Sequence, residues 1–149
     1  MFLALSDLSV LFKDHLGVQD ELLFYTVTDQ ANVIQPKGLF VSVNEGTEDL
    51  AEAMANGAIA AIWENGKKLP HYTPNQFPVF FTADSVEAIK KLLQHYLEKL
   101  NGEIEETMEI TNFKFSNKEL LNKNRETYDI AVMLKKLTKQ HVIDSEGRE

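Results

Sequence analysis

The chain has 149 residues, of which 44% are hydrophobic and 26% are charged, and this length and composition suit a globular domain with its own core. A formal net charge of −8 argues against a nucleic-acid partner, because an acidic surface repels the phosphate backbone, and the lack of cysteine excludes disulfides, thiol catalysis and cysteine-ligated metals. The sequence contains neither a long apolar run nor a convincing signal peptide, so we expect no membrane association and a cytoplasmic location.

The N-terminal third of the chain predicts a helix followed by two strands. Leucine residues recur at near-helical spacing over residues 3–16, where Ser6 is a suitable N-cap and Gly17 a suitable C-terminal stop. The run 22–28 is rich in aromatic and β-branched residues and predicts a strand. After a polar connector, the apolar run 39–43 predicts a short buried strand.

The middle of the chain predicts a second helix and two further strands. The helix is expected over residues 47–56, with Gly57 ending it. Residues 58–63 are small and apolar and predict a buried strand, and the polar, proline-containing segment 67–76 predicts a loop. The run 77–82 predicts the next strand.

The strongest helix prediction begins after Asp84, where Glu87 follows three residues later as in a capping box. Gly102 is expected to end this helix. Its apolar residues recur at steps of three and four and form one face: Val86, Ile89, Leu92, Leu93, Tyr96, Leu97 and Leu100.

The composition of the sequence changes after Gly102, where an acidic segment begins. Residues 1–102 predict an α/β domain in which a mixed β-sheet is packed with helices, and residues 103–149 predict a C-terminal extension. The extension contains a predicted strand at 110–115 and an amphipathic helix at 128–139. The apolar face of that helix consists of Ile130, Met133, Leu134 and Leu137.

Four motifs in the first 100 residues occur in a fixed order. They are Thr28-Asp29-Gln30-Ala31, Pro36-Lys37-Gly38-Leu39-Phe40-Val41, Asn56-Gly57-Ala58, and Phe80-Phe81-Thr82-Ala83-Asp84-Ser85-Val86-Glu87-Ala88. In this order and spacing they resemble the opening domain of Mur ligases of the MurE/MurF type. Those bacterial enzymes of peptidoglycan biosynthesis add amino acids to a UDP-linked cell-wall precursor. The resemblance implies the Mur ligase N-terminal-domain fold for residues 1–100.

The resemblance also implies a ligand site. In that family the domain holds the UDP end of the nucleotide-sugar substrate, through the loop after the first strand and the loop after the Phe-Val strand. Ala31 stands where the family has arginine, and the family's Asp-Gly-His loop is missing, so two sources of donors are lost. For Thr28-Asp29 the alternative is a turn-forming role. Carried onto this chain, the UDP-substrate-binding residues are Thr28, Asp29, Gln30, Asn44, Glu45 and Gly46.

The ATP-binding loop of the family is not found. Where it is expected, residues 110–112 read Ile-Thr-Asn, which shares two residues with the family's Ile-Thr-Gly. The glycine that lets the backbone approach a phosphate is absent. Gly66-Lys67 is the only Gly-Lys pair, and Lys68 follows it in place of serine or threonine, so this pair predicts a turn.

The histidines give no sign of a metal or catalytic site, since they are too far apart for a short ligand spacing. They are His15, His71, His95 and His141. No nucleophile motif accompanies them, and we expect no catalytic residue, no metal and no cofactor.

Three functions are compatible with these observations. The first is a stand-alone, non-catalytic protein that binds a precursor of the UDP-N-acetylmuramoyl-peptide type. The second is an interaction or regulatory module that has lost nucleotide binding and docks a protein partner, or a second copy, through residues 103–149. The third is the substrate-binding part of a split ATP-dependent amino-acid ligase.

Overall fold

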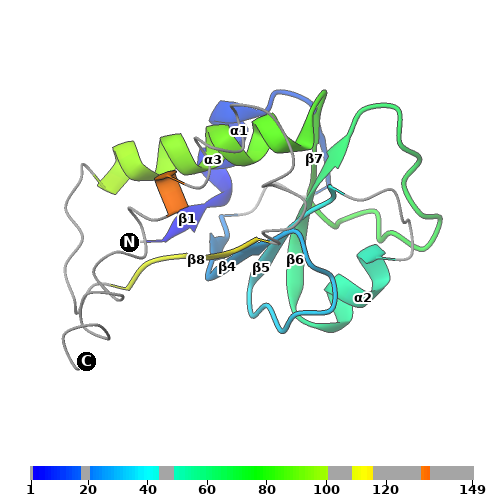
Figure 1. The fold of residues 1–149 in the computed structure, drawn as a ribbon. Helices are drawn as coiled ribbons and strands as arrows, with labels where there is room; N and C mark the ends of the chain where they lie inside the picture. The colour runs from blue at the N-terminus through cyan, green and yellow to red at the C-terminus, as the bar shows by residue number, and fades with distance from the viewer. Residues whose placement is uncertain (1, 18–20, 44–48, 101–108, 116–131, 135–149) are drawn as a thin grey trace.

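The computed structural model describes residues 2–17, 21–43, 49–100, 109–115 and 132–134 (Figure 1). Within these ranges, no helix has the length and apolar character needed to cross a membrane. The predicted helix end at Gly102 and the predicted helix at 128–139, apart from residues 132–134, lie outside the described residues.

A six-stranded mixed sheet forms the centre of the described structure, in the order β2-β7-β6-β5-β4-β8. Strands β4 to β8 run parallel to one another, and β2 pairs antiparallel with β7. The strands are β2 (His15–Leu16), β4 (Thr26–Thr28), β5 (Gly38–Val41), β6 (Ala58–Glu64), β7 (Val79–Thr82) and β8 (Asn112–Lys114). A separate antiparallel pair joins β1 (Leu3–Ala4) to β3 (Leu23–Phe24).

Helices cover both faces of the sheet, which confirms the predicted α/β architecture of a mixed sheet packed with helices (Figure 1). On one face lie α1 (Leu5–Leu11) and α3 (Ser85–Leu100), and on the other lies α2 (Asp49–Ala55). Side chains alternate along the central strands. Leu39 and Ile62 join the core under α1 and α3, whereas Phe40 and Trp63 join the core under α2. Strands buried on both faces are largely apolar, as are β5 and the part of β6 before Glu64.

Helix α3 forms as predicted. Asp84 is its N-cap, because its Oδ1 accepts hydrogen bonds from the backbone N–H groups of Val86 at 2.9 Å and Glu87 at 3.4 Å. The predicted apolar face is buried or half-buried against the sheet. Local capping and long periodicity are the strongest helix signals, and here they agree.

The prediction of a single helix over residues 3–16 was wrong in its ends. Helix α1 stops at Leu11, and Ala4 rather than Ser6 precedes its first turn. The helix stops because His15 and Leu16 pair with β7. Gly17 follows that strand with φ +92°, where an added Cβ would lie 2.3 Å from the Phe77 carbonyl oxygen. This glycine permits a close approach of two backbones and does not end a helix.

The predicted strand over residues 22–28 is divided at Tyr25. Residues before it pair with β1 as β3, and residues after it enter the main sheet as β4. The Tyr25 backbone bridges two other segments, since its N–H donates to the Lys37 carbonyl at 3.1 Å and its carbonyl accepts from the Asn112 N–H at 2.9 Å.

The described part of the extension belongs to the same structure. The predicted strand at 110–115 forms as β8, parallel to β4 at the edge of the main sheet. Met133 and Leu134 are half-buried and pack against the core under α1 and α3. The predicted docking face of Ile130, Met133, Leu134 and Leu137 thus has two described residues, and both pack against the core of this chain.

Candidate functional site

The carboxyl ends of four parallel strands meet along one edge of the sheet, which we call the carboxyl edge. It consists of the residues that end or follow β4, β5, β6 and β7: 28–30, 42–43, 64–67 and 82–85. In open α/β sheets, ligands bind outside the carboxyl ends of the strands.

Three predicted binding residues lie on this edge. Thr28 is fully buried, and its Oγ1 accepts a hydrogen bond from the Gln30 N–H at 3.0 Å. This hydrogen bond stabilises a turn, which is the alternative to ligand binding that the sequence analysis gave for Thr28. Asp29 is 3% exposed and Gln30 is half-buried, so the polar groups of this turn are held close to the sheet.

Parallel pairing brings this turn beside the end of β5. Thr28 pairs with Phe40, so the chain after Thr28 leaves the sheet next to Val41 and Ser42. The two loops that the sequence singled out therefore start from neighbouring strands on the same edge. The predicted residues of the second loop lie outside the described residues: Asn44, Glu45 and Gly46.

The structure adds a cation that the sequence analysis missed. The Lys67 Nζ donates a hydrogen bond to the Ser42 Oγ at 2.7 Å and lies 5.0 Å from the centre of the Trp63 ring. Ser42 is buried, and its carbonyl accepts a hydrogen bond from the Ser85 Oγ at 2.6 Å. Lys67 therefore reaches from the end of β6 to the end of β5. Only the pairing of these strands reveals this position, because in sequence Lys67 is one residue of a turn.

Acidic side chains occupy the neighbouring part of the edge, where α3 begins. The Glu64 Oε2 accepts a hydrogen bond from the Ser85 N–H at 3.1 Å, and Asp84 caps the same helix. After β6 the chain continues on the α2 face of the sheet, whereas after β7 it continues on the α3 face. Ligands of open α/β sheets often bind where the connections after two neighbouring strands go to opposite faces. Here two carboxylates already take the first N–H groups of α3, so an anionic ligand is disfavoured at this helix end.

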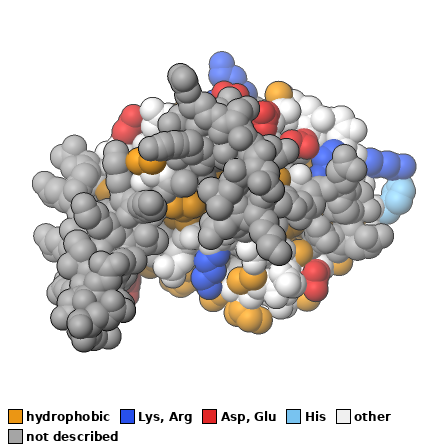
Figure 2. Space-filling model, viewed as in Figure 1, with side chains coloured by type: hydrophobic (Ala, Val, Ile, Leu, Met, Phe, Trp, Pro, Cys, Tyr) orange, Lys and Arg blue, Asp and Glu red, His pale blue; other side chains and the backbone are white. Residues whose placement is uncertain are grey.

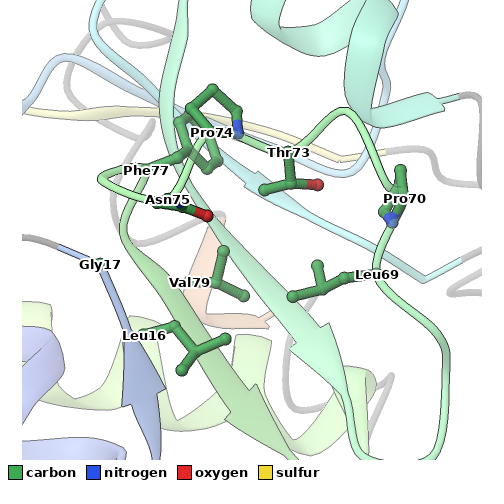
Figure 3. A pocket seen from close by; sticks show the side chains of 9 residues that line it. All are labelled: Leu16, Gly17, Leu69, Pro70, Thr73, Pro74, Asn75, Phe77 and Val79. Atoms are coloured by element: carbon green, nitrogen blue, oxygen red, sulfur yellow. The ribbon is translucent and has the colours of Figure 1, made fainter.

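A hollow of about 260 Å³ lies at the opposite end of β7 (Figure 3). Leu16, Leu69 and Val79 point toward one another from three segments, and the loop 70–77 closes one side. Its lining contains no ionisable side chain, and the Thr73 Oγ1 is buried without a hydrogen-bond partner among the described residues. This hollow lacks the cation that a phosphorylated ligand requires.

The charged side chains form no broad patch of one sign on the face in Figure 2. Among its described residues, lysines stand in separate small groups among acidic and apolar side chains. Within the part of the chain that the structure describes, no group of three or more His, Asp and Glu side chains is arranged to hold a metal ion.

Comparison with models of known protein families finds no match to this chain, and comparison with curated proteins also finds none.

A separate charged cluster joins α1 to α3. The Asp7 Oδ2 accepts hydrogen bonds from the Lys99 Nζ at 2.7 Å and the Ala4 N–H at 2.8 Å, and its Oδ1 lies 3.0 Å from the His95 Nε2. Lys99 also donates to the Phe2 carbonyl at 3.2 Å. Burial alone would raise the pKa of the Asp7 carboxyl, but its hydrogen bonds and the Lys99 charge outweigh burial and hold that pKa below its ordinary value. The cluster fixes the N-terminal segment to α3.

We expect Asp7→Asn to lower the free energy of unfolding at pH 7 by about 2 kcal/mol, because it removes the charge that pairs with Lys99 and one of the two acceptor oxygens of the cluster. The folded-state pKa of Asp7 is lowered, so its stabilisation is present above the unfolded-state pKa and is lost as pH falls through the folded-state pKa. Urea unfolding from pH 7 to pH 3 checks this. The difference between the variant and the unaltered chain should shrink in acid. The exposed Glu98→Gln on α3 is the control for loss of one negative charge, and a difference that stays constant with pH would refute the linkage.

Proposed function

We propose that this chain has a Mur ligase N-terminal-domain-like fold and binds a UDP-linked cell-wall precursor, of the UDP-N-acetylmuramoyl-peptide type, at its carboxyl edge. One observation carries the proposal. The sequence resemblance links the turn at 28–30 to UDP. That turn and the chain leaving β5 at 42–43, which leads to the second loop named by the resemblance, follow neighbouring parallel strands and lie on the same edge. In such sheets this edge is the usual location of a nucleotide site.

The chemistry of the edge supports a uridine nucleotide. Uracil presents one N–H donor and two carbonyl acceptors, which small polar groups and free backbone positions can pair. At the start of this loop, Asp29 carries a carboxylate that is almost fully buried, and Gln30 carries a half-buried amide. A diphosphate needs a cation or several N–H donors, and Lys67 supplies a cation between the ends of β5 and β6. Both halves of the ligand therefore have suitable partners on one edge.

The β8 region supports binding without catalysis. In the family, an ATP loop is expected near this strand, but residues 109–115 contain no glycine. Thr111 is 1% exposed, and its side chain is hydrogen-bonded to two backbone groups of the core. Without glycine, the backbone of residues 109–115 has no position suited to close approach to a phosphate. We therefore expect no ATP hydrolysis by this chain alone.

Calorimetric titration with a UDP-N-acetylmuramoyl-peptide tests the proposal. We expect saturable heat with a dissociation constant at or below the millimolar range, and a loss of at least roughly tenfold in affinity for Asp29→Ala. Glu98→Ala, which removes one carboxylate from an exposed site on α3, should leave the affinity unchanged. No heat at millimolar ligand, with the chain folded, would reject nucleotide binding.

A further inference from the structure

We propose that Lys67 is the diphosphate-binding residue of the carboxyl edge, an inference that rests on the proposed function. Nothing in the motif that resembles Mur ligases includes this lysine. It comes from the fold alone, which turns the chain after β6 back over the end of β5 and sets the ammonium group against the Ser42 hydroxyl.

The position of Lys67 suits a ligand that begins at the 28–30 turn. Strands β4, β5 and β6 are consecutive neighbours in the sheet, and a spacing of about 4.8 Å per strand puts the ends of β4 and β6 roughly 10 Å apart. An extended nucleoside diphosphate is long enough to span such a separation. With uracil at Asp29 and Gln30, its phosphates would therefore arrive over the ends of β5 and β6.

The surrounding charges make this lysine the favoured partner. Glu64 and Asp84 are acidic and occupy the start of α3, so phosphate is repelled from that end of the edge. Two other lysines are near: Lys68 follows in the sequence, and Lys114 pairs with Thr28 at the end of β8. Both have exposed side chains. An exposed, strongly hydrated ammonium contributes less to anion binding than one already held at the site.

Lys67 is held before any ligand arrives. Its side chain is half-buried, its Nζ is 2.7 Å from the Ser42 Oγ, and it lies over the Trp63 ring. Ser42 is itself fixed by the Ser85 hydroxyl. A cation with a fixed position loses less conformational entropy on binding, and partial burial strengthens its attraction for phosphate. The alternative is that Lys67 only braces the turn between β6 and the following loop.

Trp63 gives the site an internal reporter. It is the only tryptophan in the chain, it is fully buried, and the Lys67 ammonium lies 5.0 Å from its ring centre. A phosphate that draws the ammonium toward itself alters the cation–π contact and hence the tryptophan emission. We expect UDP and inorganic diphosphate to change this emission, and uridine to change it less.

The test compares calorimetric titrations of UDP, uridine and inorganic diphosphate across four variants. Lys67→Met should weaken UDP binding by roughly 10- to 100-fold and leave uridine binding unchanged, whereas Lys67→Arg should retain most of the UDP affinity. Lys68→Met and Lys114→Met remove the same charge nearby and should change the UDP affinity less than about threefold. A purely bracing lysine would instead alter stability without separating UDP from uridine.

The outcomes separate this inference from the proposed function. If UDP binds and Lys67→Met binds it as well as the unaltered chain does, or if Lys114→Met causes the loss, the inference is overturned and the function stands. If UDP fails to bind but inorganic diphosphate binds through Lys67, the function is overturned and Lys67 remains an anion site. If neither ligand binds, both are overturned.

Discussion

Replacing Gly57 with alanine is expected to lower the free energy of unfolding by about 3 kcal/mol or more. Gly57 lies between α2 and β6 with φ +118°, a conformation that L-residues rarely adopt. An added Cβ would lie 2.6 Å from the Gln35 carbonyl oxygen, which is backbone and cannot rotate away. The same connection carries hydrogen bonds from the Gln35 N–H to the Asn56 carbonyl at 2.9 Å and from the Gly38 N–H to the Gly57 carbonyl at 3.1 Å. A shift of Gly57 therefore strains the start of both β5 and β6.

Gly66→Ala provides the matched control for this substitution. Gly66 also has positive φ, +88°, but an added Cβ there has no neighbour within 4 Å. We expect it to cost about 1 kcal/mol, from backbone strain alone. Urea unfolding of the two variants measures the difference, which isolates the clash with Gln35. Equal losses in the two variants would contradict the packing described at Gly57.

Replacing Thr111 with valine is expected to cost about 3 kcal/mol, because two buried backbone groups lose their partner at once. The Thr111 Oγ1 donates to the Phe24 carbonyl at 2.6 Å and accepts from the Leu3 N–H at 2.9 Å. The Thr111 N–H donates to the Tyr96 hydroxyl at 2.9 Å. Burial raises the pKa of this tyrosine, although its hydrogen bond to Thr111 opposes the rise. One residue thus ties β1, β3 and α3 to the start of β8.

Thr111→Ser separates the hydroxyl from the methyl group. Serine keeps both hydrogen bonds and loses one buried methyl group, so we expect a loss of only about 1 kcal/mol. Chemical unfolding at pH 7 compares the two variants. If valine is no more damaging than serine, the hydroxyl does not hold the N-terminal strands as the structure indicates.

Thr111 also has contacts that its local sequence does not indicate. Next to Ile110 it resembles the Ile-Thr that precedes an ATP loop, and the missing glycine argues against that role. The structure gives Thr111 a position in the core, braced by residues that are distant in sequence. A short motif does not reveal contacts across more than a hundred residues.

The sequence predicted well those helices and strands whose bounds are set by nearby residues. It did not predict bounds that depend on pairing with a distant strand. The cap at Asp84 and the long periodicity after it specify α3, and apolar runs bounded by Gly38 and Gly57 specify β5 and β6. The pairing of Leu16 with Val79 ends the first helix early. Likewise the switch from β3 to β4 at Tyr25 depends on two different partner strands. Neither pairing has a signal in the local sequence.

The candidate site divides in the same way. The turn at 28–30 was found by resemblance, and its proximity to Ser42 follows from the parallel pairing of β4 with β5. Lys67 was interpreted only as a turn residue, because its contact with Ser42 requires the pairing of β5 with β6. Its role as the local cation is therefore an inference from the fold.

Amide chemical-shift mapping during a UDP titration locates nucleotide binding at the carboxyl edge residue by residue. We expect saturable shifts at the backbone amides of Asp29, Gln30, Ser42 and Val43 and at the Trp63 indole N–H. Amides at the opposite edge, such as Gly57, should stay unshifted. A folded chain whose amides do not move at millimolar UDP, or whose shifts gather around the hollow beside Val79, would contradict nucleotide binding at this edge.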